Sequence, residues 1–195
     1  MMEFLNILKE GKEYKEQVYA LYETAFPKEE QKPISYMEKW AEEGKAELLA
    51  VVEEREFIGL VMNMFSSSAA VLDYFAISPE KRSGGYGGKA VRGLVERFQG
   101  QKYVFEIEKQ DELAENAEDR KRRKAFYLRN GLKETGLFVH AYDTDFEILT
   151  PDGELTFWEY VDFLREVMYE QYEDMLKEML GKDLYLASPS LIEER

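Results

Sequence analysis

The sequence contains no cysteine and a single histidine, His140. Without cysteine the chain can form no disulfide, no thiolate metal site and no acyl-cysteine intermediate. The carboxylates show no spacing typical of metal ligands, so we expect no bound metal. A chain without cysteine also fits a reducing compartment, and we expect a cytoplasmic location.

Long apolar runs are missing as well. No stretch approaches the roughly 18–20 consecutive apolar residues that a membrane span requires. The first residues, MMEFLNILKEGKEYKE, lack the basic start and the apolar block of a signal peptide. We therefore expect no membrane partner.

Basic residues are scarce, with 26 Lys and Arg against 40 Asp and Glu and a formal net charge of -14. Nucleic-acid binding depends on neutralising phosphates, so this charge argues against a nucleic acid as partner. It would favour a cationic substrate by electrostatic steering. Solubility alone also accounts for it.

The chain has 195 residues, 45% of them hydrophobic, which predicts one domain with an appendage. Apolar periodicity and turn residues indicate strands and helices in a mixed order. The expected strands are 4–8, 46–52, 57–65, 71–78, 103–108, 137–142 and 146–149, with 46–65 a hairpin; the expected helices are 14–26, 33–44, 89–98, 120–130 and 156–180. No pattern is apparent over 184–195.

The most informative stretch runs from Val71 to Gly100. An apolar run rich in β-formers, VLDYFAIS, precedes a glycine-rich loop, PEKRSGGYGG, and a segment with apolar residues at helical spacing. The start of a helix has free N–H groups and a partial positive charge, and glycines let the backbone approach an anion closely. The stretch therefore predicts a phosphate or pyrophosphate site.

Two common phosphate motifs fit this loop poorly. A P-loop requires glycine where Ser83 stands and serine or threonine where Ala90 stands. A dinucleotide fingerprint matches Gly85, Gly87 and Ala90, and Glu106 could be its ribose-binding acid. However, a long spacer separates strand and glycines, and too little sequence follows to build a doubly wound sheet.

The string Arg82-x-x-Gly85-x-Gly87, after a strand and before a helix, resembles the acetyl-CoA motif of the GNAT (GCN5-related) N-acetyltransferase family. Downstream, Phe126-Tyr127 and Gly131-Leu132 resemble a second element of that family, with leucine in place of the usual phenylalanine. Arg120 stands where many members have asparagine. The resemblance implies that acetyl-CoA contacts Phe75, Ala76, Ile77, Arg82, Ser83, Gly84, Gly85, Tyr86, Gly87, Gly88 and Lys89.

The resemblance also implies the fold. We expect an α/β (α+β) domain whose mixed, mostly antiparallel sheet of about seven strands is flanked by helices. This GNAT-like domain would cover 1–154, and a helical extension, 155–195, would pack on it. Thr156 and Glu159 have the spacing of a capping box at the start of that extension. Its apolar positions could form a homodimer seam, or could simply cover one side of the domain.

Acetyl transfer to an amine needs a base for the amine, donors for the developing oxyanion and a proton for the thiolate. The resemblance gives the last role to Tyr127, which would otherwise be an aromatic core residue. It assigns the oxyanion to backbone N–H groups near Phe75–Ile77. The basic run 120–124 could contact the 3′-phosphate of CoA, or could balance the acidic run before it.

The sequence offers several candidates for the base. Glu106 and Glu108 share a face of their strand, opposite Tyr103, Phe105 and Ile107. Asp73 lies in the strand expected to hold the acyl group, and His140 is a further candidate. Val71 stands where some members of the family have a base, and a water chain is the remaining alternative.

These observations predict an acyltransferase that moves an acetyl group from acetyl-CoA directly to a primary amine of a small molecule. Tyr127, Glu106 and Asp73 are its predicted catalytic residues. The alternatives are a non-catalytic CoA-binding or regulatory module on the same fold and, with less support, a dinucleotide-binding protein.

Overall fold

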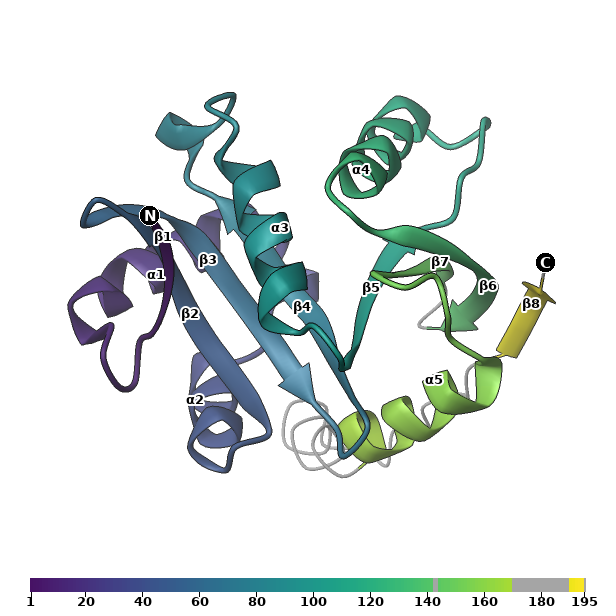
Figure 1. The fold of residues 1–195 in the computed structure, drawn as a ribbon, viewed down its shortest axis with the longest axis horizontal. Helices are drawn as coiled ribbons and strands as arrows, with labels where there is room; N and C mark the ends of the chain where they lie inside the picture. Colours follow the sequence, from purple (N-terminus) through teal and green to yellow (C-terminus); the bar gives the residue numbers. More distant parts are fainter. Residues whose placement is uncertain (142–143, 170–189, 195) are drawn as a thin grey trace. The chain divides into compact units, whose positions relative to one another are not determined.

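The computed structural model describes residues 1–141, 144–169 and 190–194, and Figure 1 shows its ribbon. Its contacts divide it into two units. The first comprises 1–65 and 71–94, and the second comprises 66–70 and the residues from 95 onward. Two elements cross this division, the strand β4 (Ala69–Ile77) and the helix α3 (Tyr86–Arg97).

Four neighbouring strands form the sheet of the first unit, in the order β1-β2-β3-β4. β1 (Met2–Asn6) pairs antiparallel with β2 (Ala46–Glu53), and β2 pairs antiparallel with β3 (Glu56–Phe65). The expected hairpin is confirmed, and its turn places Glu54 and Arg55 at positive φ. Nearly all of β2 is buried, because both of its faces are covered.

Helices cover both faces of this sheet. α1 (Lys15–Ala25) and α2 (Ile34–Glu42) lie behind it in the view of Figure 1, and α3 lies in front. Short 3-10 turns precede or connect these elements, at Lys12–Tyr14, Lys28–Glu30 and Pro79–Lys81. The helices bury the apolar residues whose spacing predicted them: Val18, Leu21 and Tyr22 in α1, Met37 and Trp40 in α2, and Ala90, Val91 and Leu94 in α3.

The sheet of the second unit has the order β5-β7-β6-β8, and its pairs are antiparallel. Its strands are β5 (Lys102–Glu108), β6 (Lys133–Ala141), β7 (Thr144–Thr150) and β8 (Ser190–Glu194). Its helices are α4 (Ala117–Arg129) and α5 (Phe157–Leu164), and α5 continues as a π-helical turn, Arg165–Tyr169. The mixed, mostly antiparallel α/β fold is therefore confirmed.

Several elements differ from the expectation, and β6, for example, begins at Lys133 rather than at 137. β1 occupies Met2–Asn6 rather than 4–8, although the Ile7 N–H still donates to the Leu48 carbonyl at 3.0 Å. β8 lies where the sequence shows no pattern, because its strand exists only through pairing with β6. The helix expected over 156–180 is described only as far as Tyr169, and its remainder lies outside the described residues.

The capping box at the start of α5 is confirmed. The Glu159 N–H donates to the Thr156 hydroxyl, and the Thr156 N–H donates to the Glu159 carboxylate at 2.8 Å. α5 buries Tyr160, Val161, Phe163 and Leu164. The Tyr160 hydroxyl joins α5 to Glu106 of β5 in the same unit, while the packing of the whole extension on the domain and a dimer seam farther along stay predictions.

Over the described ranges, no helix is both long enough and apolar enough to cross a bilayer. No group of three or more histidine or acidic side chains in these ranges is arranged to hold a metal ion.

Candidate functional site: an anion-binding loop and its neighbours

The loop between β4 and α3 exposes a row of backbone N–H groups. The Arg82 N–H donates to the Pro79 carbonyl, and the next backbone donor after it is the N–H of Lys89, which reaches the Gly85 carbonyl at 3.1 Å. Within the part of the chain that is described, the N–H groups from Ser83 to Gly88 have no hydrogen-bond acceptor. Unpaired donors at the start of a helix form a binding site for an anion.

Two residues give this loop its shape. Ser83 has φ of 65° and Gly85 has φ of 77°. Glycine enters this left-handed region without strain, and a serine there is unusual. Residues 82–85 are exposed, and the left-handed Ser83 and Gly85 alternate with residues at negative φ, as in the backbone nests that bind anions.

Arg82 supports the loop from its base. Its Nε donates to the Ile77 carbonyl at 3.1 Å, which ties the loop to the end of β4. Two lysines beside the loop are engaged by the β2–β3 hairpin: Lys89, which was predicted to contact acetyl-CoA, pairs with Glu53, and Lys81 pairs with Glu56 at 2.5 Å. Of these basic groups, the Arg82 guanidinium retains N–H donors for a ligand.

The last residues of β4 lie against β3 at very close range. A Cβ on Gly59 would meet the Ala76 carbonyl oxygen at 2.3 Å and the Ile77 Cα at 3.1 Å. Glycine is therefore required at this point of β3. The close approach fixes the backbone of Phe75–Ile77, which was predicted to contact the acyl group.

Asp73 is paired with a cation and is largely shielded from solvent. Its carboxylate pairs with the Lys32 ammonium, and their side chains are only 19% and 10% exposed. Lys32 lies in the segment between α1 and α2. The structure thus gives this base candidate a cationic partner that the sequence analysis did not anticipate.

In the second unit, Tyr127 extends from α4 toward β5. Its ring meets that of Phe105 at 5.4 Å and that of Phe126 at 5.3 Å, both edge-on. Burial raises the pKa of Tyr127 to about 12, and the nearby Arg123 opposes this shift. Its hydroxyl has no hydrogen bond to any described residue. The phenol is therefore protonated at neutral pH and has a proton to donate.

Glu106 lies on the other face of the same strand. Because side chains alternate along a strand, Glu106 points away from the face on which Phe105 meets Tyr127. Its carboxylate accepts a hydrogen bond from the Tyr160 hydroxyl of α5 at 2.8 Å. Glu106 and Tyr127 therefore do not meet, and any joint role requires substrate groups on both faces.

The other two base candidates are engaged in structural contacts. Glu108 contacts Arg120 at 2.9 Å and Arg123 at 3.1 Å. His140 is half-exposed and its Nδ1 lies 2.7 Å from Asp145, its partner across β6 and β7. Glu108 is thus held by two arginines, whereas the contact of His140 engages only its Nδ1 and does not involve Nε2.

The basic run 120–124 is neutralised within its own unit. Besides the two arginines on Glu108, Lys121 pairs with Glu118 at 3.2 Å and Arg122 pairs with Asp119. Lys124 pairs with Glu134 and, at 2.6 Å, with the buried Glu147. These pairs favour the interpretation in which the run balances neighbouring acidic residues.

Sequence reasoning missed two neighbours of the predicted catalytic residues, Lys32 and Tyr160. Lys32 lies in a polar turn, PKEEQKP, where nothing marks one lysine among several charged residues. Tyr160 follows the capping box of α5, and no prediction was made for it. Each contact joins distant segments, so no local pattern could have revealed it.

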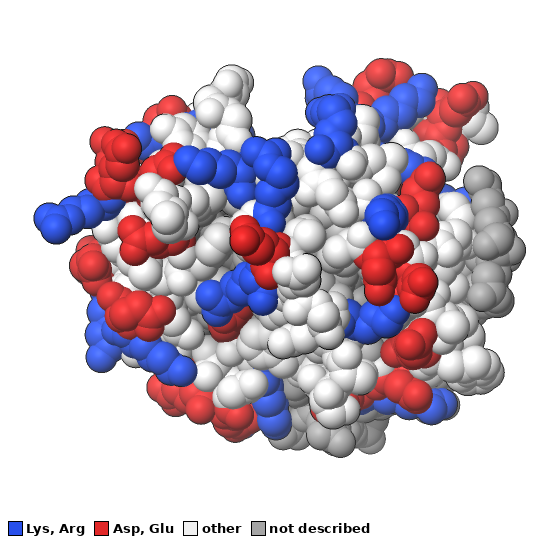
Figure 2. Space-filling model, viewed as in Figure 1, with Lys and Arg blue, Asp and Glu red and all other residues white. Residues whose placement is uncertain are grey.

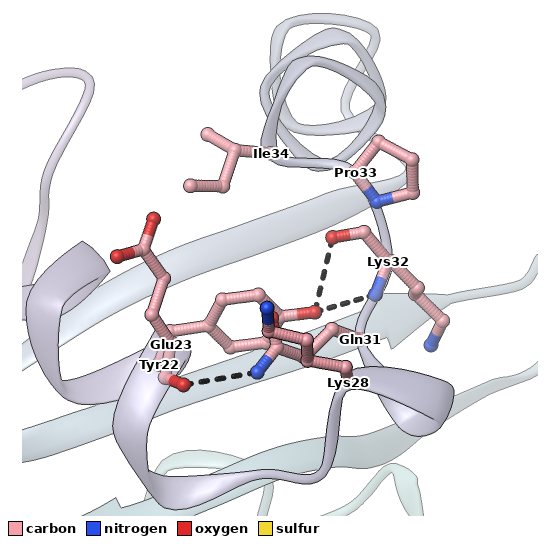
Figure 3. A pocket seen from close by; sticks show the side chains of 7 residues that line it. All are labelled: Tyr22, Glu23, Lys28, Gln31, Lys32, Pro33 and Ile34. Carbon is pink, nitrogen blue, oxygen red and sulfur yellow. Dashed lines mark hydrogen bonds between the residues drawn. The ribbon is translucent and has the colours of Figure 1, made fainter.

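A shallow pocket of about 320 Å³ lies beside Lys32, between the end of α1 and the start of α2. It is lined by Tyr22, Glu23, Lys28, Gln31, Lys32, Pro33 and Ile34, and Figure 3 shows these side chains.

The fold is similar to those of solved acetyltransferases. A putative GNAT-family acetyltransferase from Bacteroides thetaiotaomicron has a TM-score of 0.63 and 20% identity, with 95% of this chain and 99% of that chain covered. An aminoglycoside 6'-N-acetyltransferase complexed with coenzyme A has a TM-score of 0.57 and 15% identity, covering 77% and 95%.

A spermidine N-acetyltransferase from Vibrio cholerae, solved in mutant forms, has a TM-score of 0.53 and 14% identity, covering 78% of this chain and 95% of that chain. A comparison with curated protein sequences finds no match. The sequence model of the Acetyltransferase (GNAT) family matches residues 15–132, more than half of the chain and all of the loop between β4 and α3. On this match, the chain belongs to the GNAT acetyltransferase family.

Proposed function

We propose that this protein transfers an acetyl group from acetyl-CoA directly to a primary amine of a small molecule. The observation that carries the proposal is the row of unpaired N–H groups from Ser83 to Gly88 at the start of α3. An anion with several oxygens, such as a pyrophosphate, matches that row, and Arg82 adds N–H donors beside it. The residues present therefore fit the pyrophosphate of CoA.

When bound, acetyl-CoA supplies the acetyl group as a thioester. The chain's own residues would then have separate roles in binding and in proton transfer. The loop would hold the pyrophosphate, and the fixed backbone of Phe75–Ile77 would lie along the acyl arm. The phenol of Tyr127, protonated at neutral pH, would provide a proton to the departing thiolate. Glu106 is the predicted proton acceptor for the amine.

Two observations support a cationic small amine as acceptor. Structural neighbours include enzymes named for spermidine and for aminoglycosides, which are both polycationic amines. The net charge of -14 also attracts cations. Over the first unit in Figure 2, acidic and basic side chains adjoin one another, so local contacts rather than one negative field would orient the acceptor.

The test is a free-thiol assay with acetyl-CoA across diamines, polyamines, aminoglycosides and amino acids. We expect thiol release with at least one cationic amine and an N-acetylated product of matching mass. Arg82→Met should weaken CoA binding about ten-fold and leave pantetheine, which lacks the pyrophosphate, unaffected. Arg129→Met in the last turn of α4 is the matched control and should change neither.

The outcomes separate the alternatives. CoA binding that depends on Arg82, without turnover of any amine, would support the non-catalytic CoA-binding module. Equal loss of CoA and pantetheine binding in Arg82→Met would contradict the pyrophosphate assignment.

A further inference from the structure

The Lys32 ammonium lies between side chains that have the chemistry of an ammonium-binding site. It pairs with the Asp73 carboxylate and lies 4.8 Å from the centre of the Tyr74 ring. A carboxylate beside an aromatic face is the arrangement that binds primary ammonium groups. The side chain of Lys32 is only 10% exposed, so this cation is largely removed from water.

The backbone around Lys32 is held without the help of its ammonium. The Tyr22 hydroxyl accepts from the Lys32 N–H at 2.6 Å and donates to the Lys32 carbonyl at 3.1 Å. Gln31 donates to the Phe26 carbonyl at 2.7 Å, and the Tyr74 hydroxyl donates to the Glu30 carbonyl. Figure 3 shows the two bonds of Tyr22, with the ammonium of Lys32 pointing away from that ring.

The side chain of Lys32 can therefore move away from Asp73 while the backbone of its segment keeps its position. The ammonium of a lysine is joined to its backbone by a flexible four-carbon chain and is strongly hydrated when it reaches water. None of the four hydrogen bonds described above involves the ammonium of Lys32.

Asp73 lies close to the backbone assigned to the acetyl group. It precedes Phe75 by two residues on β4, so the two side chains share a face and their Cα atoms lie about 7 Å apart. A cation bound at Asp73 is thus within one side chain's reach of Phe75–Ile77.

We infer that Asp73 and Tyr74 form a subsite for a primary ammonium group of the acceptor, and that Lys32 occupies it until the acceptor displaces it. The assignment of that ligand as acceptor rests on the proposed function. The exchange breaks no covalent bond: one ammonium leaves for water, another enters, and the charge at Asp73 stays balanced. The apparent affinity for the acceptor is then reduced by the fraction of molecules in which Lys32 fills the site.

A purely structural role of the Lys32–Asp73 ion pair predicts the opposite change in amine affinity when Lys32 is replaced. If Lys32 only anchors its segment, removing its charge loosens the segment and weakens any amine binding nearby. If Lys32 competes with the acceptor, removing its charge strengthens binding. The sign of the change in affinity therefore decides between the two roles.

The experiment is calorimetric titration with 1,4-diaminobutane, without acetyl-CoA, at about 0.15 M salt to suppress binding to remote carboxylates. Lys32→Met should bind the diamine about ten-fold more tightly than the unmodified chain. The gain should vanish in Lys32→Met combined with Asp73→Asn. Lys32→Gln, which can still hydrogen-bond to Asp73, should show a smaller gain.

Lys15→Met is the matched control. The Lys15 ammonium contacts Glu38 at 2.6 Å and lies 5.6 Å from the Tyr19 ring, a similar combination of carboxylate and ring. Its side chain is 40% exposed, and it lies at the start of α1 with neither of these two partners on β4. Its replacement should leave diamine binding unchanged.

Equal or weaker binding by both folded Lys32 variants would overturn the inference, as would a gain that persists without the Asp73 carboxylate. If Lys32→Met does not fold, the comparison of Lys32→Gln with the unmodified chain decides. The thiol assay is independent of this result. If Lys32→Met binds the diamine more tightly but no amine is acetylated, the proposed function is contradicted and the ammonium subsite is supported. If an amine is acetylated but Lys32→Met does not bind the diamine more tightly, only the subsite is contradicted.

Discussion

The Tyr160 hydroxyl donates a 2.8 Å hydrogen bond to the carboxylate of Glu106, a residue 54 positions earlier in the chain. Tyr160 lies in α5, in the segment after position 155, and is 1% exposed. Glu106 lies in the middle of β5. The C-terminal segment therefore contributes a positioning group to the predicted base.

Tyr160→Phe tests this contact through the pH profile of kcat/KM. A hydrogen bond donated to a carboxylate stabilises its ionised form, and a base must be ionised to act. Without the donor, the acidic limb of the profile should move to higher pH by about one to two units, since such bonds contribute about 1.5–3 kcal/mol and one unit corresponds to about 1.4 kcal/mol.

Tyr19→Phe is the control for that prediction. Tyr19 donates a hydrogen bond of the same kind to Glu38 at 2.6 Å, in the other unit. The loss of this hydrogen bond should leave the acidic limb of the kcat/KM profile at the same pH. If the acidic limb of the kcat/KM profile does not move in Tyr160→Phe, either Glu106 is not the base or its ionisation does not depend on Tyr160.

Tyr127→Phe should lower kcat by about 10²-fold while the KM for acetyl-CoA stays nearly constant. The variant keeps the ring and its contacts with Phe105 and Phe126, so its melting temperature should change little. Steady-state kinetics and a thermal melt measure both. An unchanged kcat would mean that Tyr127 is a core residue only.

Stability should fall as the pH rises above about 10. Burial raises the pKa of Tyr22 and Tyr74, and raises that of Tyr127 to about 12. In the unfolded chain these phenols titrate near 10, so above that pH the unfolded state binds fewer protons than the folded one. The stabilising effect of the protonated phenols is complete below pH 10 and is lost above it.

Each such phenol can contribute a decline of up to about 1.4 kcal/mol per pH unit in the free energy of unfolding. Urea titrations at pH 8, 9.5 and 10.5 measure it, with tyrosinate absorbance followed in parallel. Tyr74→Phe should make the decline shallower. A slope as steep in the variant would contradict the role of Tyr74.

Gly59→Ala should destabilise the first unit by about 1–3 kcal/mol, because its Cβ would lie 2.3 Å from the carbonyl oxygen of Ala76. Gly44→Ala is the control: Gly44 has φ of 75° but no atom within 4 Å of the added Cβ, so backbone strain of about 1 kcal/mol is its only penalty. Urea unfolding compares them. Equal losses of stability in the two variants would show that β4 shifts easily to make room for the added methyl group.

Much of the fold could be predicted because its signals are local. The spacing of Val18, Leu21 and Tyr22 predicted α1, and the glycines around Tyr86 predicted the loop before α3. The alternation in β5 placed Phe105 and Glu106 on opposite faces. β8 could not be predicted, because pairing with β6 rather than its own residues makes it a strand.

By itself, the sequence determined the family and the glycine-rich loop between β4 and α3, because a motif of consecutive residues sets the backbone of that loop. The tertiary structure alone decided which partners its side chains have. Lys32 meets Asp73 across 41 positions, and Tyr160 meets Glu106 across 54. Such pairs arise only when separate elements pack together, since the attraction of a carboxylate for a cation or a hydroxyl has no preferred spacing along the chain.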